Sequence, residues 1–447
     1  MSLIAWVSRL RQGLLRQDAN ASRAFWSGTE AVAGPTAALA VSAGLIRTLG
    51  PQDYGVLVVV LAVSALSMAI NPAIVATTTK FVSEAAGLKS AEKATARITT
   101  VSLLAVLSLG ALFLVVAASL AGPLSRLLFG DQVAATRTDI HAILLLAVLT
   151  VGIQQSDAVL AAAIKGLEKF KQQALFELCS RLSIAGASIL AGWLTHDLRR
   201  VLLASCAVSL LSALLRGVLL RTLAPGGRVF ALPSRSEAAR MLSFGGWMWL
   251  NATATVAYGS VDRVIVGRVL GTAAAAQFHI YAQVSQFIHY IPTSVFAFSF
   301  PVFSRLSAGG AEQRPQLVRM YHRVIGLIGS SALLIGIVIT LVRHQAMTLL
   351  AARGLPAGDD PALLLLILGF AMLALNIAPY YLLLGLGRSK TVSIVQGLSV
   401  ILAITLALVL VPRLGLEGAA LARFGYVLGT LLLFERAHHA MRAVEIA

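Results

Sequence analysis

The chain has 447 residues, of which 58% are hydrophobic and only 12% are charged, and its mean hydropathy is +0.84. Soluble domains carry about 25% charged residues, so this composition excludes a soluble globular protein and indicates an integral membrane protein. The formal net charge of +17 could suit nucleic acid, but its distribution along the chain follows a membrane topology instead, and we expect no nucleic-acid partner.

The first element, residues 1–20, is expected to be an amphipathic helix. Leu3, Trp6 and Leu10 fall on one helical face, and Arg9 and Arg11 fall elsewhere. A basic helix with one apolar face lies in the plane of the membrane surface. We therefore expect an interfacial segment rather than a cleavable signal peptide.

The rest of the chain is read as apolar segments of the length that crosses a bilayer, about 20 residues. This pattern predicts an all-α integral membrane protein with twelve transmembrane helices. The expected spans are residues 22–48, 54–79, 97–120, 139–163, 173–195, 198–220, 241–269, 275–300, 320–342, 361–385, 390–411 and 415–436.

The basic residues between these spans alternate in number. On the side that holds both chain ends we count 23 Lys and Arg, and on the other side 10. Cytoplasmic loops carry the excess of Lys and Arg. The sequence therefore predicts that both termini are cytoplasmic, and that many of these charges meet anionic membrane lipids.

The segment 223–238 divides the spans into two groups of six. It is rich in Pro, Gly and basic residues, which is typical of a linker. We expect an N-lobe over 21–222 and a C-lobe over 239–447. Because six is an even number, the two lobes would have the same orientation and would be related by a pseudo-two-fold axis along the membrane normal.

Two weak internal repeats support this division. "LIRTLGPQDYG" at the end of the first span is echoed by "IVGRVLGTAAA" at the end of the seventh, which places Gly50 and Gly271 at an offset of 221. "AAAIKGLEKFK" after the fourth span is echoed by "YLLLGLGRSKT" after the tenth.

Polar residues inside the first span are candidates for a transport path. Arg23 and Glu30 share one helical face, and Gly34–Pro35 follows near mid-span. A charge near the bilayer centre costs about 2.5–3.5 kcal/mol on insertion scales, so it usually faces protein or water. Arg23 is also explained by snorkelling to the interface, and Gly34–Pro35 is either a hinge or an inert kink.

The fourth to sixth spans carry further charges. Gln154 and Asp157 lie in the fourth span, and Glu177 precedes Arg181 by four residues in the fifth, the spacing of a helical ion pair. This pair either lines a cavity or joins helices within the bundle. Arg216 lies near the cytoplasmic end of the sixth span, where snorkelling is the favoured interpretation.

In the second half, His279, Gln283, Gln286 and Tyr290 form one polar stripe on the eighth span. Such a stripe contacts either a polar cargo or other helices. Asp262 and Arg263, in the seventh span, are either a local pair near the interface or part of the polar path. Arg423, in the twelfth span, faces either the cavity or the outer rim.

The chain resembles the O-antigen and exopolysaccharide flippases of the multidrug/oligosaccharidyl-lipid/polysaccharide (MOP) superfamily. The resemblance rests on "IRTLGPQDYGVLVVVLAVSALSMAINPAIVATTTKFVSE" and on "VDRVIVGRVLGTAAAAQFHIYAQVSQF" followed by "FPVFSRL". It implies two six-helix lobes that face each other in a V and alternately open to each side of the bacterial inner membrane. It also implies an undecaprenyl-diphosphate-linked oligosaccharide as cargo, in a monomer that works with a polysaccharide polymerase and a chain-length regulator.

Other functions are left open by the residues. A cation-coupled multidrug antiporter of the same superfamily is the nearest alternative, although the intramembrane arginines are about as many as the acids and favour an anionic cargo. A membrane enzyme of polysaccharide assembly is less favoured, because the sequence has no H-x-x-x-x-D, D-x-D or phosphate-loop motif. We therefore expect a transporter rather than an enzyme, without cofactor or metal.

Overall fold

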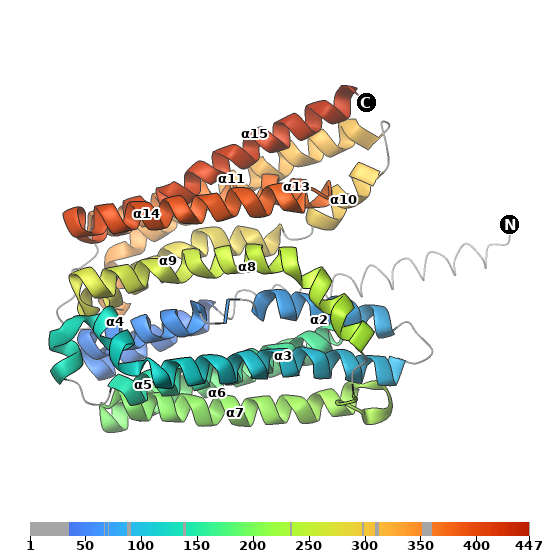
Figure 1. Ribbon diagram of the computed structural model, residues 1–447. Helices are drawn as coiled ribbons and strands as arrows, with labels where there is room; N and C mark the ends of the chain where they lie inside the picture. Colours follow the sequence, from blue (N-terminus) through green and yellow to red (C-terminus); the bar gives the residue numbers. More distant parts are fainter. Residues whose placement is uncertain are drawn as a thin grey trace.

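The computed structural model describes residues 35–66, 68–69, 71–86, 91–136, 140–232, 235–296, 299–308, 313–350 and 360–446. These residues form helices and connecting turns, and no strand occurs among them. The fold is the predicted one: an all-α membrane protein in two lobes (Figure 1).

The helices of the first half pack mainly on one another. They form the lower layer of Figure 1. Their bounds are Pro35–Leu66, α2 Asn71–Ala86, α3 Ala91–Ser119, α4 Ala121–Thr136, α5 Ile140–Gly166, α6 Phe170–Thr195 and α7 Leu198–Leu223.

The helices of the second half form the upper layer of Figure 1 and also pack mainly among themselves. The one-turn helix η1 (Pro225–Gly227) precedes them. Their bounds are α8 Arg235–Leu270, α9 Thr272–Val295, α10 Ser299–Ala308, α11 Arg314–Leu350, α12 Pro361–Ala374, α13 Ile377–Gly385, α14 Ser389–Ala422 and α15 Phe424–Ile446.

Backbone geometry repeats between the halves. Gly50 and Gly271 both have positive φ, +80° and +94°, at the predicted offset of 221. Such φ values favour glycine, so each marks a sharp turn between two spans. His196 and Gly415 form a second positive-φ pair, 219 residues apart. We call this end of the molecule the Gly271 end and the opposite end, which carries η1, the linker end.

Eight described helical segments are long and apolar enough to cross a membrane by length and composition alone. Among them, Pro35–Leu66 contains the positive-φ turn at Gly50, and Ser389–Met441 contains the turn at Gly415. α8 and α9 are not among the eight. Their polar side chains lower their hydropathy, and these two helices carry the charged and polar groups described below.

The lobes touch closely at the Gly271 end. A Cβ placed on Gly55 would overlap the carbonyl oxygen of Thr272, so the two backbones are in direct contact. One placed on Gly267 would lie 3.7 Å from Cβ of Val59. Small residues permit such approach between membrane helices, where packing replaces the hydrophobic effect as the driving force.

Two predictions about loops change. The segment after the third span was expected to be a loop, but it forms the helix α4, which contacts α3, α5 and α8. The linker predicted over 223–238 is shorter, because α7 continues to Leu223 and α8 begins at Arg235. The exact limits of the two lobes stay predictions.

Candidate functional site

Arg216 is the centre of a charge network inside the N-lobe. Its side chain is 1% exposed. Nε and Nη2 donate to the two carboxylate oxygens of Asp157 at 2.6 and 2.9 Å, Nη2 also donates to Glu177 at 2.9 Å, and Nη1 donates to Gln173 at 2.8 Å. The guanidinium also lies 4.6 Å from the ring centre of Phe176. The prediction that Arg216 snorkels is therefore wrong, because its four bonds replace water inside the bundle.

Arg181 extends this network at its edge. The predicted helical pair exists: Arg181 Nε donates to Glu177 Oε1 at 2.7 Å. Arg181 shares a face of α6 with the buried Ser188 and Gly192, yet its side chain is 43% exposed. The lipid-facing residues of α6, such as Trp193, lie on another face. The exposed Arg181 side chain therefore lies on a different face of α6 from Trp193.

Polar residues of α5 join other helices of the N-lobe. Gln154 donates to the hydroxyl of Ser209 on α7 at 3.2 Å. Its neighbour Gln155 accepts a hydrogen bond from Asn71 at the start of α2. These contacts agree with the alternative in which polar side chains connect helices.

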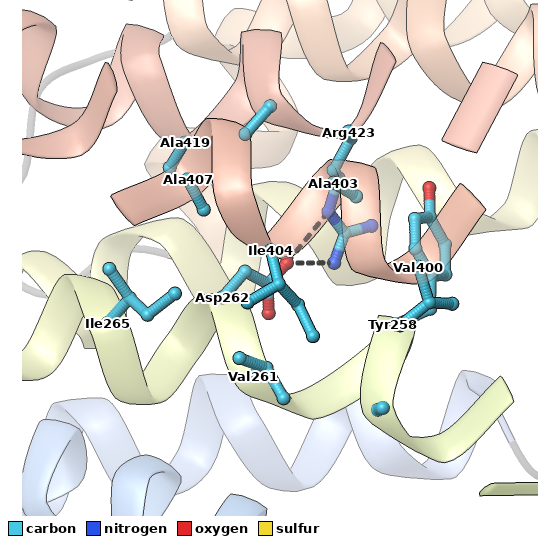
Figure 2. A pocket seen from close by; sticks show the side chains of 12 residues that line it. Tyr258, Val261, Asp262, Ile265, Val400, Ala403, Ile404, Ala407, Ala419 and Arg423 are labelled. Atoms are coloured by element: carbon cyan, nitrogen blue, oxygen red, sulfur yellow. Dashed lines mark hydrogen bonds and ion pairs between the residues drawn. The ribbon is translucent and has the colours of Figure 1, made fainter. Parts of the chain in front are cut away.

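The C-lobe contains a second ion pair, shown in Figure 2. Arg423 donates through Nε and Nη2 to Asp262 Oδ2 at 2.8 and 2.5 Å, and both side chains are less than 10% exposed. Tyr258 lies beside this pair, with its ring centre 5.0 Å from the Arg423 guanidinium. The surrounding pocket between α8 and α14 is otherwise lined by Ala, Val and Ile. The structure thus gives Arg423 a partner inside the C-lobe.

Arg263 differs from these arginines. Its predicted side-chain pair with Asp262 is wrong, because Asp262 is engaged by Arg423 and accepts only the backbone N–H of Arg263. Among the described residues no carboxylate lies within ion-pair distance of its guanidinium, and Nε is buried without a hydrogen-bond partner. Arg263 is therefore a cation whose charge no described acid balances.

The polar stripe of α9 lies opposite Arg263. Positions 263 and 279 are each eight residues from the turn at Gly271, so the α8–α9 hairpin brings them to the same depth, about 12 Å from that turn. His279 is within electrostatic range of Arg263, and its ring lies 6.2 Å from that of Tyr54 of the N-lobe. His279 Nδ1 and Gln283 Oε1 are buried without a partner in the described part of the chain. Each of these two side chains thus has a polar atom that makes no hydrogen bond, and His279 lies where the lobes meet.

The remaining stripe residues belong to the same group. Gln286 and Tyr290 are more exposed than the buried faces of α9, and Tyr290 is 39% exposed. Tyr290 also lies within electrostatic range of Arg263. We call Tyr54, Arg263, His279, Gln283, Gln286 and Tyr290 the interlobe cluster.

Some predicted site residues are not described. Arg23, Glu30 and Gly34 lie outside the described residues, and Pro35 is the first residue of the helix Pro35–Leu66. The hinge at Gly34–Pro35 stays a prediction. No group of three or more His, Cys, Asp or Glu that could hold a metal occurs in the described ranges.

The fold of the chain is similar to that of several solved membrane transporters. The chain matches an inward-facing multidrug resistance MATE family transporter of the MOP superfamily with a TM-score of 0.72, 15% identity, and coverage of 92% of this chain and 95% of that one. The outward-facing conformation of such a transporter gives 0.66, 14% identity and 96% coverage of both chains. A MOP superfamily transporter from Pyrococcus furiosus, described as having a binding pocket of reverse polarity that suggests a different function, gives 0.68, 13% identity and 96% coverage of both. The chain thus has the fold of these MOP superfamily transporters.

Within that class, a family model described as polysaccharide biosynthesis protein matches residues 22–307. This covers more than half of the chain, and the protein belongs to that family. No curated protein sequence matches it.

Proposed function

We propose that this protein is a flippase that carries an undecaprenyl-diphosphate-linked oligosaccharide across the bacterial inner membrane by alternating access. The cargo has a dianionic diphosphate and a sugar headgroup rich in hydroxyls. Neither crosses hydrocarbon alone, so the path needs an uncompensated cation and many hydrogen-bonding groups.

The observation that carries the proposal is the charge balance of the described spans. Asp157 and Glu177 bond Arg216, Glu177 also bonds Arg181, and Asp262 bonds Arg423, so three carboxylates are balanced by three arginines. The charge left over is the positive charge of Arg263. A site with surplus positive charge favours an anionic cargo, and a guanidinium suits a phosphate because its planar fork donates two parallel bonds.

The other parts of the cargo have counterparts nearby. His279, Gln283, Gln286 and Tyr290 offer donors and acceptors to sugar hydroxyls. Arg181, whose Nε is held by Glu177, is the second proposed phosphate contact. It lies in the N-lobe, so cargo held between Arg181 and Arg263 would connect the two lobes.

The orientation follows the excess of basic residues, 23 against 10. It places the linker end and both termini in the cytoplasm and the Gly271 end outside. An anion that moves outward is assisted by the membrane potential, so we propose a potential or an ion gradient as the energy source. We further propose that the protein has no catalytic activity and acts as a monomer beside a polymerase and a chain-length regulator.

The second candidate is a cation-coupled multidrug antiporter, since matched structures are multidrug transporters. Such a pump attracts a cationic drug with an acidic group. The three described acids of the span interiors are all bonded to arginine, which favours the flippase.

The test compares two arginines of one helix. Arg263→Gln should lower surface polysaccharide in cells about tenfold or more, because losing a charged contact costs about 2–5 kcal/mol. Arg268→Gln, an exposed residue five positions further along α8, is the matched control and should change export less than twofold. Equal export by both variants at equal membrane levels would refute the proposed role of Arg263.

A further inference from the structure

The linker between the lobes is attached to the N-lobe. After η1, residues 228–232 run without helical structure along α3. The Ala231 N–H donates to Thr100 Oγ1 at 3.1 Å, and Arg228 Nε lies 3.2 Å from Glu92 Oε1. Val229 is buried in the core cluster of this lobe. We call residues 228–232 the strap.

The turn that starts the strap needs glycine. Gly226 and Gly227 both have φ of +66°, a backbone conformation that residues other than glycine rarely adopt. A Cβ on Gly226 would also overlap the carboxylate of Glu92. The Pro–Gly–Gly sequence therefore directs the chain back across the end of α3 instead of away from the membrane.

The outer face of the strap is apolar. In an extended chain, side chains alternate between two faces. Val229 and Ala231 face the N-lobe, whereas Phe230 is 65% exposed and Leu232 is 92% exposed. Two large apolar side chains thus project outward next to Arg228, whose side chain is 59% exposed beside Glu92.

This apolar face continues a surface that already meets lipid. Thr100, which holds the strap, is one helical turn from Leu104 on the same face of α3, and Leu104 is 52% exposed. On α7, which ends just before η1, Leu214 and Val218 are exposed at 61% and 60%. Exposed leucine and valine on membrane-spanning helices form the lipid-facing surface, and the strap lies at its edge toward the linker end.

We propose that the strap is a membrane anchor, in which Phe230 and Leu232 insert into the lipid leaflet at the linker end. In this position the Phe230 and Leu232 side chains contact the acyl chains of the phospholipids. The Arg228 side chain lies at the depth of the lipid phosphates. Aromatic and aliphatic residues flanked by arginine are suited to this interface.

The anchor has a consequence for movement between the lobes. The first part of the linker is fixed to both α3 and the membrane, so it moves with the N-lobe. Displacement of the C-lobe must then be absorbed beyond Leu232. This inference concerns lipid and is independent of the proposed cargo.

The test measures the depth of spin labels in nanodiscs that contain only the purified full chain and phospholipid. Labels are attached to Phe230→Cys and Leu232→Cys in a background with Cys179→Ser and Cys206→Ser. Leu104→Cys is the lipid control and Lys93→Cys the aqueous control, since both side chains are exposed on α3.

The anchor predicts that labels at 230 and 232 collide with dissolved oxygen more than with a water-soluble nickel complex, with a ratio near that of Leu104→Cys and at least severalfold above that of Lys93→Cys. A ratio like that of Lys93→Cys would show a strap in water and overturn the proposal. Labels shielded from both reagents would show that protein covers the strap, which would also overturn it.

Discussion

Arg216 holds three helices of the N-lobe together through charges that are out of water. Replacing it by leucine leaves Asp157 and Glu177, which are only 15% and 17% exposed, without their shared cation, and Arg181 then remains as the partner of Glu177. Breaking a buried ion pair on one side costs about 3–5 kcal/mol. We therefore expect Arg216→Leu to lower the melting temperature of the purified protein strongly, whereas Arg221→Leu, an exposed change one turn further along α7, should leave it nearly unchanged.

The C-lobe has neutral residues at the corresponding sequence offset, the 219 residues that also separate His196 and Gly415. Asn376 and Gln396 stand 219 residues after Asp157 and Glu177 and are likewise shielded, at 6% and 7% exposure. The triple change Asp157→Asn, Glu177→Gln and Arg216→Leu removes both acids together with Arg216, and the charge it leaves without its partner is that of Arg181, whose side chain is 43% exposed. It should recover most of the stability that Arg216→Leu loses; a triple variant as unstable as the single one would contradict the electrostatic explanation.

The turns between helices make a prediction at the scale of elements. Gly271 has φ of +94° between α8 and α9, whereas Gly259 lies within α8 and has no atom within 4 Å of an added Cβ. Gly271→Ala should destabilise by about 1–2 kcal/mol because alanine is strained there. Gly259→Ala should instead stabilise by about 0.5–1 kcal/mol. The melting temperature should therefore fall for Gly271→Ala and rise for Gly259→Ala. Shifts of both melting temperatures in the same direction would contradict the turn assigned at Gly271.

Helices were predictable from the sequence where the signal is local. Apolar length placed α6 and α7 within three residues of the expected spans, and the four-residue spacing found the Glu177–Arg181 pair. α4 was missed because it is too short to cross a bilayer and was read as a loop.

The site was predictable only in part, because only some of its contacts join residues that are close in sequence. The α9 stripe is a periodic pattern within one helix, so the sequence shows it. The pairs Arg216–Asp157 and Arg423–Asp262 join residues 59 and 161 positions apart, and no spacing rule connects them. Arg263 was wrongly paired with Asp262 because the two are neighbours in sequence. In the folded protein the Asp262 carboxylate accepts hydrogen bonds from Arg423 instead. The symmetric placement of residues 263 and 279 about Gly271 was the signal available in advance.

At the scale of the whole molecule, the lobes are in contact at the Gly271 end, and the proposed transport by alternating access requires this contact to open. Cysteines at Val59 and Gly267 would have Cβ atoms 3.7 Å apart, within the range of disulfides. In the background without Cys179 and Cys206, Val59→Cys with Gly267→Cys should cross-link under oxidation and stop export, and a reductant should restore it.

A matched pair lies within a single lobe. Thr48 and Gly192 both belong to the N-lobe, with a Cβ separation of 3.4 Å. Cross-linking Thr48→Cys to Gly192→Cys should leave export largely intact, because no movement between lobes is blocked. Full export by the oxidised Val59–Gly267 variant would show that this contact need not open.

The central claim is that an anionic lipid-linked saccharide is the cargo of the interlobe cluster. The most direct measurement is translocation of a labelled polyprenyl-diphosphate oligosaccharide in proteoliposomes, followed by the exposure of its sugar to an impermeant glycosidase. The account predicts that the wild-type protein moves this lipid, that Arg268→Gln does so equally well, and that Arg263→Gln slows it about tenfold or more. Transport of a cationic dye without movement of the lipid, or unchanged lipid movement in Arg263→Gln, would contradict it.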